Sequence, residues 1–287
     1  MTKRPFSQVD VFSAEPGLGN PVAVVHEADG LDDETMASFA RWTNLSETTF
    51  LLEPTDPAAD YRLRIFTPGG ELPFAGHPTL GSAQAWLTAG GAPATSGRLM
   101  QECGIGLVEL RRDPSGLLAF AAPPLIRSGA PDDATRSAAL ASLGITDDDV
   151  VDVSWVVNGP EFLGVLLRDA DAVLALEPDF SAMADAGLAI GAVAPHAPGS
   201  TVGADLEVRG FVPGIGVDED PVTGSLNAGL ARWLVGAGHL SAPYVAAQGT
   251  ALGRRGRVHI SPDAERPDEF WVAGETTTVI EGTVELG

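Results

Sequence analysis

The chain has 287 residues, of which 44% are hydrophobic, so it is long enough to bury one large core or two medium ones. Its 17 basic residues stand against 39 acidic ones, a formal net charge of −22. An acidic surface repels nucleic-acid phosphates and anionic lipid, so we expect no nucleic-acid and no membrane partner. Lys3 is the single lysine, which excludes pyridoxal phosphate enzymes and Walker-type NTPases because both need an internal amine.

The number of cysteines and the N-terminal sequence indicate the cellular compartment in which the protein is expected. Cys103 is the single cysteine, so it can form neither an intramolecular disulfide nor a thiolate cage for zinc. The first residues lack the apolar core and cleavage site of an export signal, and no apolar run approaches the length of a membrane span. We therefore expect a cytoplasmic protein.

The first third of the chain predicts strands on either side of one helix. A loop rich in glycine and asparagine joins the first two strands. Acidic residues from Asp32 onward favour a helix N-terminus, and apolar residues at helical spacing continue the helix to near Asn44. The predicted strands are 8–12, 21–25, 48–52 and 62–66, with a turn at 67–70.

Two later segments are similar to one another. The first passes from a Gly/Pro-rich loop into an alanine-rich helix predicted over 78–89, and the second does the same 147 positions later, so that Trp86 is matched by Trp233. One titratable side chain precedes each helix, His77 in the first copy and Asp220 in the second. Alanine-rich helices with glycine-rich entrances can be alike by chance, and the alternative is a duplication that produces two similar halves.

The segment between the copies predicts a domain boundary. A polar, acidic stretch over 129–149 has the pattern of a crossover with a short helix at 132–143. We expect one half over 1–124, joined by the C-terminal strand 276–287, and a second half over 125–275. Further predicted strands are 151–157, 162–167, 205–212, 257–260 and 276–280.

The two helix entrances are candidate binding sites. Helix N-termini expose N–H groups and the positive end of the helix dipole, which suits a carboxylate, and Gly76 and Gly224 would permit close approach of a ligand. Proton transfer needs a titratable group, for which His77, Asp220 and Glu47 are candidates. Composition and spacing alone do not distinguish Glu47 from the other acidic residues.

Five motifs, in this order and spacing, resemble the phenazine-biosynthesis PhzF-like isomerase family over nearly the whole chain. The resemblance implies an α+β, diaminopimelate epimerase-like fold of two similar halves, each a curled, mostly antiparallel sheet around a central helix, with the active site between them. It also implies a homodimer. The motifs are VDVF with GNPVAVV, NLSETTFLL, RIFTPGGELPFAGHPTLGSA, RGFVPGIGVDEDPVTGSLNAG and QGTALGRRGRVHI.

The resemblance also implies roles for residues that match the motifs. These are Glu47 as the proton shuttle, His77 and Asp220 as catalytic residues lining the cleft, Gly224 and Ser225 as substrate-binding residues, and Asn20 as either a substrate contact or a turn support. The family's reaction isomerises trans-2,3-dihydro-3-hydroxyanthranilate, a cyclic amino-hydroxy carboxylic acid, by moving a proton without a cofactor. We therefore expect a small carboxylate substrate, a place in secondary metabolism, no cofactor and no metal.

Other activities remain open at this point. Related epimerases use two opposed cysteines, which this chain cannot supply, and we interpret Cys103 as structural because residues 107–110 continue its segment as a strand. A lyase or cyclase of the same fold is one alternative. A non-catalytic binding protein is another, although the joint presence of Glu47, His77 and Asp220 argues against it.

Overall fold

The structure is a computed structural model that describes residues 2–213 and 217–287. It divides into two compact units, one comprising residues 1–121 with 273–287 and the other residues 122–272. Residues 214–216, within the motif RGFVPGIGVDEDPVTGSLNAG, lie outside the described residues. Across the described ranges no helix is long and apolar enough to span a membrane.

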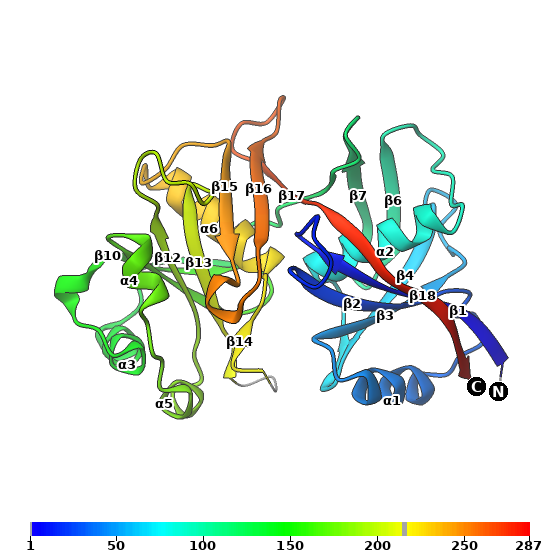
Figure 1. Ribbon diagram of the computed structural model, residues 1–287, viewed down its shortest axis with the longest axis horizontal. Coiled ribbons are helices and arrows are strands. Elements are labelled where there is room, and N and C mark those ends of the chain that lie inside the picture. The colour runs from blue at the N-terminus through cyan, green and yellow to red at the C-terminus, as the bar shows by residue number, and fades with distance from the viewer. Residues whose placement is uncertain (1, 214–216) are drawn as a thin grey trace. The chain divides into compact units, whose positions relative to one another are not determined.

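The first unit is a mixed sheet with two helices (Figure 1). Its strands are β1 (Thr2–Val11), β2 (Asn20–Val25), β3 (Glu47–Leu52), β4 (Tyr61–Thr67), β5 (Gly70–Leu72), β6 (Arg98–Cys103), β7 (Gly106–Arg112), β8 (Leu118–Ala121) and β18 (Thr276–Leu286), and its helices are α1 (Asp33–Thr43) and α2 (Gly76–Thr88).

Over its described residues, the second unit is a mixed sheet with four α-helices. Its strands are β9 (Arg127–Gly129), β10 (Val150–Val157), β11 (Phe162–Leu167), β12 (Ala189–Pro195), β13 (Leu206–Phe211), β14 (Glu219–Asp220), β15 (Tyr244–Gln248), β16 (Gly256–Pro262) and β17 (Phe270–Gly274), the last of which ends in the first unit; its helices are α3 (Asp133–Leu143), α4 (Ala170–Leu174), α5 (Phe180–Asp185) and α6 (Gly224–Gly236). Short 3₁₀ turns lie at Asp147–Asp149 and Thr250–Leu252.

The two sheets repeat one pattern of strand pairing. In the first unit, β2 and β3 run parallel, as do β4 and β6, and the remaining pairs from β1 to β7 are antiparallel. In the second unit, β11 and β12 are parallel, as are β13 and β15, and the other pairs from β10 to β16 are antiparallel. The register repeats as well, because Tyr61 pairs with Gln101 and Val208 with Gln248, both 147 positions later. The duplication predicted from sequence is therefore present in the fold.

Each unit has a buried helix along one face of its sheet. Helix α2 packs against β1, β2 and β3, and α6 packs against β10 and β16. Because alternate residues of a strand point to opposite faces, the other face is available to the remaining helices. On β3, Phe50 belongs to the α1 cluster, and in the second unit α3, α4 and α5 pack around a separate apolar cluster.

Glycines allow the buried helices to approach their sheets. A Cβ atom at Gly81 of α2 would lie 2.4 Å from Val22 Cγ1, and one at Gly229 of α6 would lie 2.5 Å from the Val156 carbonyl oxygen. Both distances are shorter than van der Waals contact, so a larger residue would force the helix away from the strand.

Most predicted elements are observed, with shifted ends. Helix α1 follows the N-cap Asp32, whose carboxylate accepts from Thr35 N–H, and it ends at Asn44 in the left-handed conformation. Helix α2 begins at Gly76, two residues before the predicted start, since burial overrides the poor helix propensity of glycine. Strand β1 begins at Thr2 and β18 continues to Leu286, because the two strands pair with each other along their length (Figure 1).

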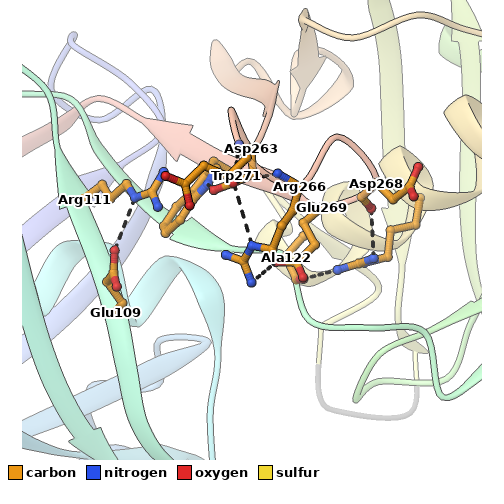
Figure 2. Close-up of polar contacts among 10 residues, drawn as sticks. Glu109, Arg111, Ala122, Asp263, Arg266, Asp268, Glu269 and Trp271 are labelled. Atoms are coloured by element: carbon orange, nitrogen blue, oxygen red, sulfur yellow. Dashed lines mark hydrogen bonds and ion pairs between the residues drawn. The ribbon is translucent and has the colours of Figure 1, made fainter.

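Polar contacts fix the turn between β16 and β17 in the second unit. The Asp263 carboxylate accepts the Trp271 indole N–H at 2.7 Å (Figure 2). It also accepts the backbone N–H groups of Glu265 and Arg266. The Arg232 guanidinium of α6 donates to the carbonyl oxygens of Ala122 and Pro123, where this unit begins. The Arg232 bonds hold the first residues of the unit to its central helix α6, and the Asp263 bonds hold the turn before β17 to that strand.

We expect Gly229→Ala to destabilise the protein by about 1–3 kcal/mol, because the added methyl group collides with the backbone of β10. Gly236→Ala is the matched control, since it ends the same helix with no atom within 4 Å of the added Cβ and should be neutral or slightly stabilising. Urea unfolding of both variants measures the difference. Equal stability of the two would contradict the packing argument.

Candidate active site

The start of α2 brings together two of the predicted residues, a carboxyl group and an imidazole. Glu47 is the first residue of β3 and His77 is in the first turn of α2, and Glu47 Oε2 lies 3.3 Å from His77 Nε2. Both side chains are largely buried, with 14% and 5% exposed. Two residues along β3, Thr49 Oγ1 lies 2.8 Å from Ser82 Oγ on α2, so the same face of the strand is held to the helix at two points.

The remaining predicted residues of this unit lie beside His77. Asn20 is fully buried at the start of β2, with Nδ2 3.5 Å from His77 Nδ1. Gly76 is the first residue of α2, and a Cβ atom there would lie 2.5 Å from Phe120 Cζ. Glycine at 76 therefore has a packing reason as well as the predicted role in substrate approach. The N-cap residue Ala75 provides no side-chain cap for the helix.

Burial keeps the imidazole neutral. Desolvation lowers the pKa of His77 from the ordinary 6.5 to about 3, and a hydrogen bond to the Pro21 carbonyl opposes the shift only in part. Because the ring is neutral near pH 7, the 3.3 Å contact with Glu47 is not an ion pair.

The second unit brings together the predicted residues Asp220, Gly224 and Ser225 at the start of α6. Asp220 ends β14, and its Oδ2 accepts a 2.6 Å hydrogen bond from Thr223 Oγ1. Gly224 and Ser225 form the first turn of α6, whose N-cap Thr223 makes no side-chain cap. The Ser225 carbonyl accepts from Asn158 Nδ2 at 2.8 Å.

Several polar residues of this second group were missed by sequence reasoning. Gln248 and Asn227 are buried and bonded to Thr223, and Asn158 binds the first turn of α6. Gln248 begins the motif QGTALGRRGRVHI, to which no function was given. The usable signal was its spacing of 147 from Gln101, which matches the spacing of the tryptophans.

Cys103 ends β6, and Ile105 and Gly106 carry the chain directly into β7. Burial raises the pKa of the Cys103 thiol, which disfavours the thiolate that catalysis would require. The segment continues as a strand, as predicted. Within the described residues, no cluster of three or more histidine, cysteine or acidic side chains has the arrangement of a metal site.

Comparison with known proteins agrees with the sequence motifs. The sequence profile of the family described as phenazine biosynthesis-like protein matches residues 9–282. The chain belongs to this family. Relatives that are 36% identical to the chain include the following two. One is antisense-enhancing sequence 1 of Schizosaccharomyces pombe, with 98% of this chain and 99% of the relative covered. The other is the trans-2,3-dihydro-3-hydroxyanthranilate isomerase of Pseudomonas aeruginosa, with 97% and 98% covered.

Solved structures show the fold of the family. A phenazine biosynthesis protein of the PhzF family from Enterococcus faecalis superposes with a TM-score of 0.82 at 24% identity, covering 99% of this chain and 100% of that chain. A hydroxyproline epimerase from Agrobacterium vitis superposes with a TM-score of 0.57 at 13% identity, covering 98% and 92%. The predicted α+β fold with two epimerase-like halves is confirmed.

The pKa of His77 predicts how stability depends on pH. Its folded value of about 3 lies below the unfolded value near 6.5, so between these values the unfolded state binds more protons and stability falls as pH falls. We expect His77→Gln to lessen this acid destabilisation, by up to about 1.4 kcal/mol for each pH unit in the window. Urea unfolding from pH 4 to 8 measures the slope in both proteins. An imidazole that titrates near pH 6.5 by nitrogen NMR would contradict the prediction.

Proposed function

We propose that this chain is a cofactor-independent isomerase that moves a proton on a small cyclic or unsaturated amino or hydroxy carboxylic acid. The observation that supports this proposal most directly is the buried pair at the start of α2, where a carboxyl group lies 3.3 Å from a neutral imidazole. The names of relatives support isomerisation as the reaction class, and one of them supplies trans-2,3-dihydro-3-hydroxyanthranilate as the first substrate to test.

Glu47 is the proposed acid and base. As a carboxylate it would remove a proton from a carbon next to an unsaturated group, and as a carboxylic acid it would return the proton to another carbon on the same face. His77 would orient the Glu47 carboxyl group through the 3.3 Å contact. Because the ring is neutral, it adds no positive charge that would stabilise the Glu47 carboxylate against protonation. Asn20, on the other side of the ring, would support this orientation.

The groups at the start of α6 are proposed to bind substrate. The N–H groups of Gly224 and Ser225 point along the helix axis at its positive end, where a substrate carboxylate is stabilised. Asp220 would accept a hydrogen bond from an amino or hydroxyl group of the same substrate. Gly76, at the start of α2, is proposed as a second point of approach.

We expect Glu47→Gln to lower kcat by on the order of 10² or more with folding intact, because glutamine keeps the shape of the side chain but cannot carry the proton. Glu53→Gln is the matched control, since Glu53 follows the same strand and is exposed. The assay follows loss of trans-2,3-dihydro-3-hydroxyanthranilate, with circular dichroism as the check on folding. A fully active Glu47→Gln enzyme would disprove the assigned role.

Turnover in D₂O separates the isomerase from the alternatives. One carboxyl group that removes and returns the proton gives a product with the mass of the substrate plus at most one deuterium at the new C–H bond. A lyase or cyclase that eliminates water or ammonia gives a lower mass, and a binding protein gives no product. Mass spectrometry reads all three results, and either of the last two contradicts the isomerase.

A further inference from the structure

Gln248, at the end of β15, uses the full hydrogen-bonding capacity of its side chain within one loop. Its Oε1 accepts from Thr223 N at 3.0 Å and from Asn227 Nδ2 at 2.8 Å. Its Nε2 donates to the Asp220 carbonyl at 3.1 Å and to Thr223 Oγ1 at 2.9 Å. A side-chain amide offers two donors and one oxygen with two lone pairs, so this fully buried group has a single orientation.

These bonds also fix the direction of the Thr223 hydroxyl. Because the Gln248 amide nitrogen can only donate, Thr223 Oγ1 is the acceptor in that bond. The single hydroxyl proton is then available to Asp220 Oδ2, which lies 2.6 Å away. The hydrogen bonds therefore run in one direction, from Gln248 through Thr223 to the Asp220 carboxylate.

Gly210 on β13 and Gly249, directly after β15, provide the space for this arrangement. A Cβ atom at Gly210 would lie 2.9 Å from Thr223 Oγ1 and 3.2 Å from Gln248 Nε2. Gly249 has φ +91°, and a Cβ atom there would lie 2.6 Å from the Pro221 carbonyl oxygen. The glycine that follows Gln248 is thus required both by its backbone conformation and by the close approach of the Asp220 loop.

The first unit also has a buried glutamine bonded to a threonine of its central helix, but the two threonines do not correspond: Thr79 matches Leu226 at the spacing of 147. Gln101, 147 positions before Gln248, is also fully buried, and its Nε2 donates to Thr79 Oγ1 on α2 at 3.1 Å. Its Oε1 accepts from Tyr61 OH. Within the described ranges, Thr79 has no carboxylate bonded to its hydroxyl. The buried glutamine is therefore common to both units, whereas its bond to the N-cap threonine and the extension to Asp220 are found in the second.

We propose that Gln248 and Thr223 are positioning residues that orient the Asp220 carboxylate for catalysis. The proposal rests on the proposed function in that Asp220 acts on substrate. It assigns the first residue of the motif QGTALGRRGRVHI a role beyond folding, because Gln248 joins the Asp220 carboxylate, through Thr223, to the backbone at the start of α6.

The test is Thr223→Val, which removes the hydroxyl and keeps the size of the side chain. Thr223 makes no side-chain cap on α6, so the change does not remove a helix cap. We expect the crystal structure of the variant to show the Asp220 carboxylate rotated from its position with α6 unmoved, and kcat to fall roughly ten-fold. Thr223→Ser, which restores the hydroxyl, should restore both. A carboxylate that stays in place in Thr223→Val overturns the proposal.

A double-mutant cycle separates positioning from general damage. If Thr223 acts through Asp220, adding Thr223→Val to Asp220→Asn should change kcat less than about two-fold, whereas independent defects would multiply. Thr79→Val is the control, since it breaks a buried glutamine–threonine bond that has no carboxylate beyond it, and it should lower stability with little change in kcat. Multiplying defects, or an equal loss of kcat in Thr79→Val, contradicts the proposal.

The two hypotheses fail in different ways. A wild-type protein that does not turn over the test substrate contradicts the proposed function, whereas the position of the Asp220 carboxylate in the variant structures still decides whether the network orients it.

Discussion

The exclusion of water from the first turn of α2 is the physical condition on which the candidate active site depends. Most residues in the first half of this helix are buried, from Gly76 to Ala83, and the side chain of His77 is only 5% exposed. Removing an imidazole from water penalises its charged form, so the ring beside Glu47 is neutral. The same close packing explains why a glycine is needed in this helix. The backbone of α2 lies so near β2 that a methyl group at Gly81 would collide with Val22.

The repeated halves carry different chemistry on one scaffold. Both units bury a central helix and hold its first turn with a glutamine from the strand that follows. The first unit adds a carboxyl group facing a neutral imidazole, and the second adds an aspartate held by a threonine. The shared scaffold buries the first turn of each central helix and fixes its position, while one or two side chains in each unit determine the chemistry available there.

The sequence was informative where structure is determined locally. Asp32 and Asn44 mark the ends of α1 because capping involves residues within one turn of the helix. The start of β1 was missed because Lys3, Arg4 and Pro5 show no alternation of apolar residues, and the strand exists there through pairing with β18 at the other end of the chain.

The same distinction applies to the candidate site. The change from a Gly/Pro-rich loop to an alanine-rich helix located the entrance at His77, but the sequence does not show that Glu47 is 3.3 Å from it, and only the family resemblance singled out this glutamate. The spacing of 147 between Gln101 and Gln248 is visible in the sequence, but the bond from Gln248 to Thr223 is not, since these two residues lie 25 positions apart along the chain. Contacts between distant segments depend on the packing of the sheet, which composition and periodicity do not report.

The pairing of β1 with β18 has a consequence for the order of folding on the ribosome. Residues 122–272 form one continuous unit, so its strands and helices are all available once that stretch has been synthesised. The first unit begins earlier but lacks one edge of its sheet until β18 emerges, and β1 meanwhile presents unpaired backbone groups along its length. The half made first is thus completed last, and the nascent chain must keep an open strand edge from pairing elsewhere while the second half forms.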